Sequence, residues 1–460
     1  MWRSVLWFFE KLQKEGSFIR NVSIVSSWNV AGIIAQFVLS PIITRIYTPA
    51  EYGVYALFNS IVINLSLISS LKYTETIVLA DNDRQRNNII LLAFCLTTAF
   101  SFITLCGIFT FKEELAAFFN TNTNNNFLYL IPAGVFLTSG LEILISINIR
   151  KKLFFRNGLS GFLNNISARS FNIFYGIVLL PKAIGLIMGD LFGKILAVLS
   201  ILFSFKNPRY SLQFFLRSVN KKAIASIARQ YKSFPLYFLP SSMLIYLSGH
   251  LPIYFFQAKF GSTTVGAYAL ASSMLEIINR LIPYALSPVF LQKANELKNI
   301  SLSHLSERVY KLFLYMLLLG TIIFAGFALV GETIFPFVFG KEWLKSGAFV
   351  AVLAIPYAFN FVAVSLSEVY NVIGRQRFLL ANSIVNVVLK VIAIITIMYL
   401  EVSELNALLI YSLVSSVGGI FLIVGVFSIL NYRLWRVSSL LFISLFVLVF
   451  ALTLGNFLRA

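Results

Sequence analysis

Ten charged residues lie inside long apolar stretches of the sequence, beyond the first three and before the last three positions of each stretch. The cations are Lys72, Arg169, Lys194, Arg280 and Lys390, and the acids are Glu75, Glu142, Asp190, Glu276 and Glu368. A charge placed within a membrane costs roughly 2.5–3.5 kcal/mol on insertion scales, so each of these residues needs a partner or a function. The chemistry open to such a set is ion pairing, anion binding by the cations and binding of a coupling ion by the acids.

Three of the cations have an acid within one helical turn. Lys72 and Glu75 are spaced i,i+3, whereas the pairs Asp190/Lys194 and Glu276/Arg280 are spaced i,i+4. On a helix, both spacings place the two side chains on one face. Ion pairing is therefore favoured for these residues, with a direct role toward a substrate as the alternative.

Arg169 and Lys390 have no acid at such a spacing. Each falls on the fifth apolar stretch of its half of the chain, in equivalent places. Two cations facing each other across a twofold axis would form an anion site, and an arginine suits phosphate oxygens. Glu142 and Glu368 lie on the preceding stretch of each half, as partners of these cations or as sites for a coupling ion.

Catalytic motifs are missing from the sequence. Two histidines, His250 and His304, lie far apart, and the usual metal, nucleophile-elbow and phosphate-loop patterns do not occur. Cys95 and Cys106 lie eleven residues apart on one predicted helix, about 16 Å, too far for a disulfide, and we expect both to be small core residues. Asp81-Asn82-Asp83 resembles a sugar-transferase metal motif but lies in a tight loop. We expect no catalytic residue, metal or cofactor, and hence no enzyme.

The elements that position these charges are membrane-spanning helices. Hydrophobic residues make up 58% of the 460 residues and charged residues only 12%, whereas soluble chains carry about 25% charge. A spanning helix needs about 20 apolar residues. Thirteen stretches qualify: 22–44, 54–80, 88–110, 127–148, 160–181, 184–205, 233–256, 265–290, 309–331, 347–371, 380–400, 404–428 and 438–457.

The number of basic residues alternates between high and low from one segment connecting two spans to the next. With the N-terminus in the cytoplasm, 25 of the 37 Lys and Arg residues fall in inner segments and 7 in outer ones. This bias is the positive-inside pattern. It also accounts for the net charge of +19 without a nucleic-acid partner, because the basic loops face anionic membrane lipid.

Five regions follow from this reading. We predict an interfacial amphipathic segment at 1–20, an N-lobe of six spans at 21–205, a basic cytoplasmic linker at 206–232, a C-lobe of six spans at 233–428 and an extra C-terminal span at 429–460. The two halves share short similar segments at equivalent places. After the first span of each half lie EYGVYAL (51–57) and TVGAYAL (264–270), which echo each other in sequence. Before the fifth span of each half lie RKKLF (150–154) and RQRFL (375–379). An even number of spans in each half makes this a parallel repeat, typical of two bundles related by a pseudo-twofold axis.

Several stretches together resemble a known family. They are SPIITRIYTPAEYGVYAL (40–57), YKSFPLYFLPSSMLIYLSGHLPIYFFQAKFGSTTVGAYALASSMLE (231–276), FGKEWLKSGAFVAVLAIPY (339–357) and NVIGRQRFLL (371–380). They are similar to the polysaccharide transporter branch of the multidrug/oligosaccharidyl-lipid/polysaccharide exporter superfamily, which includes Wzx-type O-antigen flippases. Twelve spans are usual in that family, so the thirteenth departs from its pattern.

The resemblance implies an all-α polytopic membrane protein with two six-helix lobes in a V shape, a cationic cavity and alternating access. The substrate would be an undecaprenyl-pyrophosphate-linked oligosaccharide for O-antigen or a related surface polysaccharide, flipped across the bacterial inner membrane. A polysaccharide polymerase and a chain-length regulator are possible partners. The candidate cavity residues are Arg169, Lys390, Arg280, Lys72 and Arg45, and the candidate ion-coupling residues are Glu142, Glu368, Glu276 and Asp190.

Three other functions stay open. A multidrug exporter of the same superfamily would favour an acidic cavity for organic cations. A membrane polysaccharide polymerase or ligase would need a large outer loop with catalytic basic residues. A peptidoglycan-precursor flippase would share the fold but be essential for growth.

Overall fold

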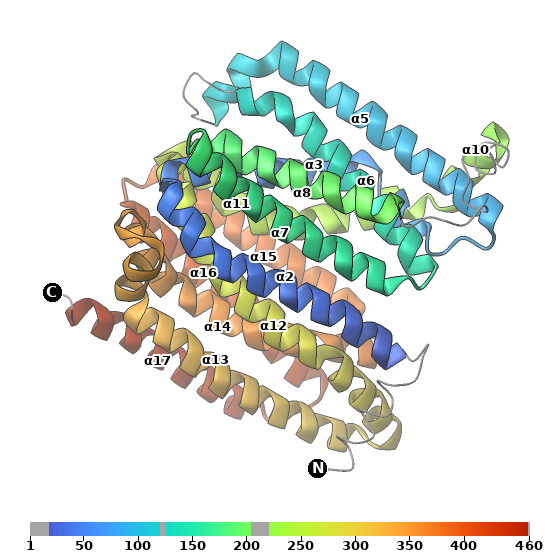
Figure 1. Cartoon of the computed structure of the whole chain (residues 1–460). Coiled ribbons are helices and arrows are strands. Elements are labelled where there is room, and N and C mark those ends of the chain that lie inside the picture. The colour runs from blue at the N-terminus through green and yellow to red at the C-terminus, as the bar shows by residue number, and fades with distance from the viewer. Residues whose placement is uncertain (1–17, 120–125, 204–219, 459–460) are drawn as a thin grey trace. The chain divides into compact units, whose positions relative to one another are not determined.

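The computed structural model of the chain describes residues 18–119, 126–203 and 220–458 (Figure 1). Within these ranges the regular structure is helical and no strand is formed. Each of the thirteen apolar stretches lies largely in one long helix, which confirms the prediction of an all-α polytopic fold. Most of the predicted interfacial segment (1–20) and residues 206–219 of the predicted linker fall outside the described residues.

The helices divide between two compact units. The first contains the described residues up to Tyr47 and Val54–Tyr246, and the second contains Thr48–Gly53 and the residues from Leu247 onward. Helices of the first unit are α2 (Phe18–Ile46), most of α3 (Pro49–Ser69), α4 (Tyr73–Thr76), α5 (Asp83–Phe118), α6 (Ile131–Arg150), α7 (Phe154–Val178), α8 (Ala183–Leu202) and α10 (Lys221–Gln230). Helices of the second are most of α11 (Leu239–Phe260), α12 (Ser262–Ile300), α13 (Leu302–Phe339), α14 (Leu344–Ile373), α15 (Gln376–Tyr399), α16 (Glu404–Ile429) and α17 (Leu434–Phe457). The predicted lobe and linker boundaries stay a prediction.

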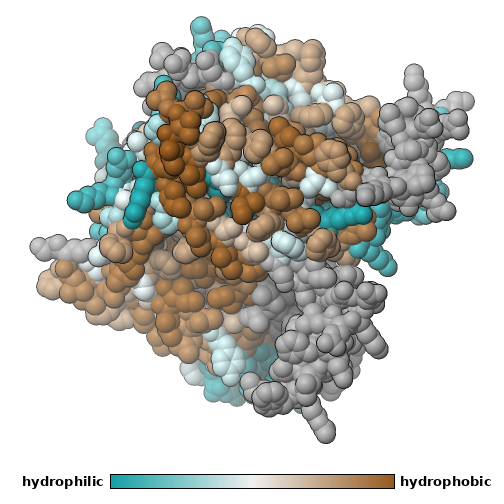
Figure 2. Space-filling view, viewed as in Figure 1, coloured by the Kyte–Doolittle hydropathy of each residue, from teal (hydrophilic) through white to brown (hydrophobic). Residues whose placement is uncertain are grey.

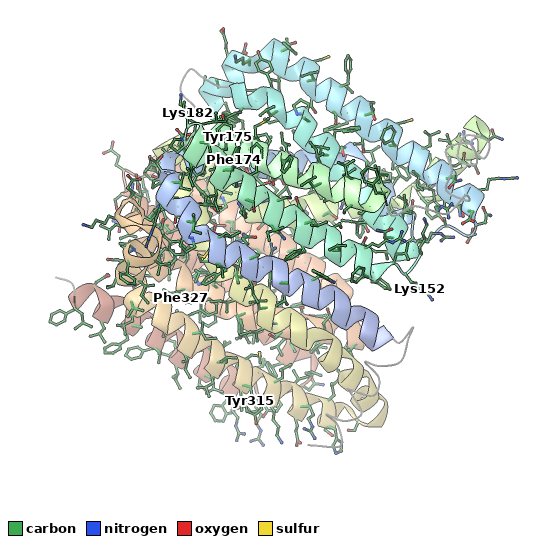
Figure 3. All side chains as sticks on the ribbon, in the orientation of Figure 1. Lys152, Phe174, Tyr175, Lys182, Tyr315 and Phe327 are labelled. Atoms are coloured by element: carbon green, nitrogen blue, oxygen red, sulfur yellow. The ribbon has the colours of Figure 1, made fainter. Side chains whose placement is uncertain are left out.

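Ten helical segments among the described residues are long and apolar enough to cross a membrane. The three other long helices, α2, α7 and α11, match predicted spans but are outside this set; in α2 the apolar segment found is the shorter Val30–Ile46. Large apolar side chains cover much of the surface in Figure 2. On α7, for example, Phe174 is 60% exposed, and on α13 Tyr315 is 68% exposed (Figure 3). Such surfaces suit contact with lipid rather than water.

The predicted span 54–80 is wrong in its second half. Helix α3 ends at Ser69, because Leu71 and Lys72 adopt positive φ angles of 49° and 61°, which a right-handed helix excludes. The short helix α4 then carries Glu75. Lys72 and Glu75 still form the predicted ion pair at 3.6 Å, but across this turn rather than along a spanning helix.

Small residues allow close helix packing in the first unit. Helix α7 packs against both α2 and α8. The Tyr47 hydroxyl after α2 donates to the Asn172 carbonyl on α7 at 2.8 Å. A Cβ at Gly189 on α8 would lie 1.8 Å from the end of the Asn172 side-chain amide and 2.8 Å from the Ala168 backbone carbonyl oxygen, so glycine allows these two helices to approach closely.

Helix α14 forms the centre of the second unit, where it packs against α12, α13 and α16. Of its most apolar 18-residue window, 78% is buried. The same unit brings the two echoing segments together. A Cβ on Gly53 would lie 1.8 Å from the Ser262 carbonyl oxygen, and one on Gly266 would lie 1.8 Å from the Pro49 carbonyl oxygen. The glycines shared by EYGVYAL and TVGAYAL therefore mark one close crossing of α3 and α12.

Candidate functional site

A polar cavity of about 210 Å³ lies inside the second unit. Five helices, α11, α12, α14, α15 and α16, contribute to its wall. The lining residues are Gly249, Tyr268, Glu276, Leu353, Pro356, Tyr357, Asn360, Asn386, Lys390, Tyr411, Ser415 and Gly419. Two candidates from the sequence, Lys390 and Glu276, are therefore brought together here.

Lys390 extends from α15 into this cavity. Its ammonium group donates to the Ser248 hydroxyl on α11 at 3.2 Å. The same nitrogen lies 5.9 Å from the centre of the Tyr411 ring on α16, within the range of a cation–π contact. A hydroxyl and a ring face hold the side chain in place but leave its positive charge unneutralised by either contact. Lys390 is thus well placed to meet an anion.

Glu276 provides the carboxylate of the cavity. Arg280, one turn further along α12, donates from Nε to a carboxylate oxygen of Glu276 at 3.2 Å, as the i,i+4 spacing predicts. The Arg280 side chain is 62% exposed and that of Glu276 is 38% exposed. Arg280 does not line the cavity, so the pair connects a cavity carboxylate to a guanidinium at a more open surface.

Tyrosines and amides complete the wall. Tyr268, Tyr357 and Tyr411 contribute aromatic side chains to the lining, and Asn360 and Asn386 contribute amide side chains. The side-chain oxygen of Asn386 is buried and accepts no hydrogen bond from the described residues. At about 30 Å³ per water molecule, the cavity holds about seven waters. It therefore accommodates one ring or one charged group of a larger ligand.

The candidates in the first unit form separate groups. The Glu142 carboxyl on α6 interacts electrostatically with Lys72 and Glu75. On α8, Lys194 contacts Asp190 at 2.8 Å, and both side chains are mostly buried. This pair, like Glu276/Arg280, has the predicted ion-pair geometry.

The remaining candidates are not among the residues that line the cavity of the second unit. Arg169 is half-buried on α7, and Arg45 is exposed in the last turn of α2. Glu368 on α14 accepts a hydrogen bond from Asn371 at 2.9 Å and does not line the cavity. The acid that shares a cavity with Lys390 is consequently Glu276.

Similarity to known proteins agrees with this architecture. A family described as polysaccharide biosynthesis protein matches residues 42–348, about two thirds of the chain. The chain belongs to this family. The succinoglycan biosynthesis transport protein ExoT of Rhizobium meliloti is 21% identical over 338 residues, which cover 73% of this chain and 65% of ExoT, slightly less than two thirds of that relative.

Solved structures share the fold of this family member at low sequence identity. The lipid II flippase MurJ in an inward closed conformation has a TM-score of 0.64 at 12% identity, covering 95% of this chain and 98% of MurJ. An inward-facing multidrug resistance transporter of the MATE family has a TM-score of 0.58 at 12% identity, with 88% and 94% coverage. The chain therefore has the exporter-superfamily fold, as its resemblance to the polysaccharide transporter branch implied.

Sequence reasoning missed the uncharged residues of the cavity in this family member. Tyr268 lies within the echo TVGAYAL and Tyr357 within the stretch FGKEWLKSGAFVAVLAIPY, so both were part of informative segments. Tyr411 and the asparagines Asn360 and Asn386 carried no signal beyond being polar groups in apolar stretches. A search for buried amides as well as charges would have found the asparagines.

Proposed function

We propose that the chain is a flippase for an undecaprenyl-pyrophosphate-linked oligosaccharide, the repeat unit of O-antigen or a related surface polysaccharide. It would move this lipid across the bacterial inner membrane by alternating access. Membership of the polysaccharide biosynthesis family supports a role in that pathway. The relative ExoT is named for transport in succinoglycan biosynthesis, and MurJ, which shares the fold, is described as a lipid II flippase.

The observation that carries this proposal is the cavity containing Lys390. Its ammonium offers a charge-assisted contact to a phosphate oxygen. The faces of Tyr268, Tyr357 and Tyr411 are suited to sugar rings, and the amides of Asn360 and Asn386 to hydroxyl groups. In this proposal Arg169 is the corresponding cation of the first unit, and Glu276 is the candidate for ion coupling.

The electrostatics favour export. A pyrophosphate carries about two negative charges, and each charge that crosses 100 mV changes the free energy by about 2.3 kcal/mol. With a negative cell interior, outward movement is downhill by roughly 4–5 kcal/mol per 100 mV when the charges cross unneutralised. The protein must therefore mainly provide a polar, cationic path for a head group that the lipid excludes.

Transport in proteoliposomes tests the proposal. Purified protein is reconstituted with a labelled undecaprenyl-pyrophosphate oligosaccharide, and its appearance in the opposite leaflet is followed. Lys390→Gln should slow translocation about tenfold or more, because one charge-assisted contact contributes about 1.5–3 kcal/mol, whereas Lys390→Arg should retain much of it. Lys311→Gln, which removes an exposed cation from α13, is the matched control. An unchanged rate in Lys390→Gln would refute the assignment of this cavity.

Glu276 favours one alternative function. A carboxylate among three tyrosine faces is also chemistry for an organic cation, and MATE multidrug transporters share the fold. If the chain exports drugs, its expression should raise resistance to organic cations and Glu276→Gln should abolish that effect. For the flippase, resistance is expected to stay unchanged while translocation of the lipid-linked oligosaccharide is measurable.

A further inference from the structure

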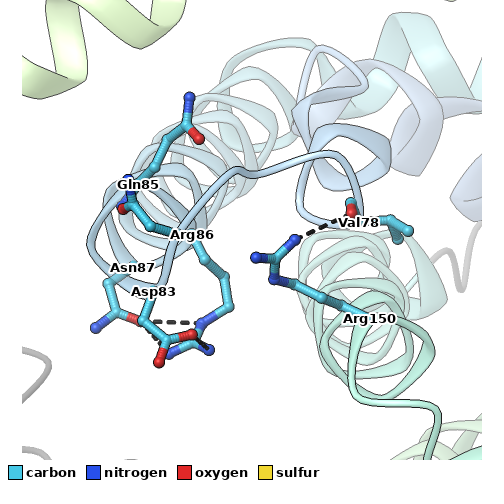
Figure 4. Close-up of polar contacts among 7 residues, drawn as sticks. Val78, Asp83, Gln85, Arg86, Asn87 and Arg150 are labelled. Atoms are coloured by element: carbon cyan, nitrogen blue, oxygen red, sulfur yellow. Dashed lines mark hydrogen bonds and ion pairs between the residues drawn. The ribbon is translucent and has the colours of Figure 1, made fainter.

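A second cavity, of about 570 Å³, lies in the first unit at the ends of three helices. It is lined by Val78, Asp83, Arg86, Ile149, Arg150, Lys151, Lys152 and Phe154. These residues come from the loop after α4, the start of α5, the end of α6 and the start of α7. Figure 4 shows Val78, Asp83, Arg86 and Arg150 among them. The count of basic residues predicts that this end of the unit faces the cytoplasm.

The lining residues include four cationic side chains and one carboxylate. That carboxylate, Asp83, forms an ion pair with Arg86, whose side chain is only 3% exposed. Arg86 is further fixed by bonds from Nε and Nη2 to the Asn87 side-chain oxygen at 3.2 and 2.9 Å. The arginine is therefore held rigidly in the wall of the cavity, and its charge is largely matched by Asp83.

The other three cations follow one another at the end of α6. The helix ends at Arg150, and Lys152 adopts a left-handed φ of 58°, so that the backbone N–H of Leu153 bonds to the Asn148 carbonyl at 2.8 Å. This turn directs Arg150, Lys151 and Lys152 to one cavity. Arg150 donates to the Val78 carbonyl at 3.1 Å, which ties it to the opposite loop (Figure 4).

Lys151 is affected first by burial and then by neighbouring positive charges. Burial, followed by the positive charges of Arg86 and Arg156, lowers the pKa of Lys151 to about 7, against a smaller opposing effect of Asp83. A bound anion would reverse this effect and draw a proton onto the lysine. The apolar members of the wall are Val78 in the turn after α4, Ile149 near the end of α6 and Phe154 at the start of α7. Because α6 is long and apolar enough to cross a membrane, its end is expected to lie near the lipid phosphates.

We propose that this cavity, which we call the basic pocket, binds the phosphate group of a membrane lipid through Arg150, Lys151 and Lys152. The Arg86–Asp83 ion pair holds the wall of the pocket in place, and the apolar residues contact the first part of the lipid tail. The site is separate from the cavity of Lys390 and does not depend on the proposed transport function. A lipid phosphate here has two possible sources, an anionic phospholipid of the bilayer and the pyrophosphate of a polyprenyl carrier.

Native mass spectrometry of the full chain in neutral detergent tests the proposal. The two probes are phosphatidylglycerol and undecaprenyl pyrophosphate without sugar, titrated separately. The pocket variant is Arg150→Gln/Lys151→Gln/Lys152→Asn, with asparagine chosen because it tolerates the left-handed backbone. The control variant Arg308→Gln/Lys311→Gln/Arg377→Gln removes three exposed cations from the second unit, on the face that is also predicted to be cytoplasmic.

The pocket variant should bind at least one of the two lipids about tenfold more weakly than the wild type, and the control variant should not. The lipid that loses binding identifies the source of the phosphate. In the wild type this binding should also weaken from pH 6 to pH 8, a dependence that Lys151→Gln removes. Equal binding of both lipids by the pocket and control variants would overturn the proposal. The single variant Lys152→Asn, at an exposed position, provides the same comparison with less risk to folding, with a smaller expected loss.

Discussion

Asp190 and Lys194 form an ion pair within α8, with side chains that are 17% and 9% exposed. Replacing Asp190 by Leu leaves a mostly buried ammonium without its carboxylate, so we expect a loss of about 3–5 kcal/mol in stability. Replacing both residues, as Asp190→Leu/Lys194→Met, should recover most of that loss. Thermal unfolding of the purified variants, followed by intrinsic fluorescence, measures both effects.

The same variants distinguish two roles for Asp190, ion pairing with Lys194 and binding of a coupling ion. If Asp190 only pairs with Lys194, the double variant should transport as well as the wild type. A double variant that is stable but inactive would instead assign Asp190 to ion coupling, the alternative that the sequence left open.

The lowered pKa of Lys151 predicts a dependence of stability on pH. The folded pKa is about 7, below the ordinary value of 10.5. Between these pH values the unfolded chain holds a proton that the folded chain lacks, so stability should rise with pH from about 7 toward 10.5. Lys151→Gln should flatten this rise and stabilise the protein most below pH 7. Parallel melting curves for wild type and variant from pH 6 to 9 would contradict the prediction.

Spacing predicted some of these side-chain contacts but not others. The pairs Asp190/Lys194 and Glu276/Arg280 lie within one helical turn, so local geometry alone places their charges together. Lys390 instead contacts Ser248, 142 positions away, and lies near the Tyr411 ring. Contacts between helices depend on packing angles and register, which a single sequence does not specify.

At the level of helices, the close crossing of Gly53 and Gly266 makes a sharp prediction. In Gly266→Ala the new Cβ would meet the Pro49 carbonyl oxygen at 1.8 Å, and a carbonyl in the backbone cannot rotate away as a side chain can. We expect a loss of at least 1–3 kcal/mol from overpacking. Gly326→Ala on α13 is the control, because no atom lies within 4 Å of its added Cβ.

Melting temperatures and the yield of monodisperse protein measure this difference. Gly326→Ala should melt at or slightly above the wild-type temperature, since alanine favours a helix by up to about 1 kcal/mol. Equal melting temperatures for Gly266→Ala and Gly326→Ala would show that α3 and α12 do not cross as closely as described.

The apolar stretches predicted the existence of the helices better than their ends. Helix α3 ends eleven residues before the predicted boundary at 80, because the break lies in a backbone conformation at Leu71 and Lys72 that no glycine or proline announces. Cys95 and Cys106, expected in the core, are both exposed on α5. In a membrane protein apolar residues face lipid as well as core, so hydrophobicity does not tell the two faces apart.

For the whole molecule, the sequence predicts how the helices are arranged across the membrane, and that arrangement can be tested by labelling. The bias of Lys and Arg places the N-terminus inside, and thirteen crossings would then place the C-terminus outside. Helix α7 offers a direct test, because Lys152 precedes it and Lys182 follows it (Figure 3). Its 25 residues span about 37 Å, enough to cross a hydrocarbon core of about 30 Å.

Cysteine accessibility in intact cells tests this orientation. In a background with Cys95→Ser and Cys106→Ser, Lys182→Cys should react with a membrane-impermeant maleimide added outside. Lys152→Cys should react only after the membrane is opened. Labelling of both from outside would mean that α7 does not cross, which would change the number of spans and the side of the C-terminus. The reverse pattern would invert the whole molecule, and the basic pocket at Lys151 would then face the outer leaflet, where the negative surface potential of the cytoplasmic leaflet is absent.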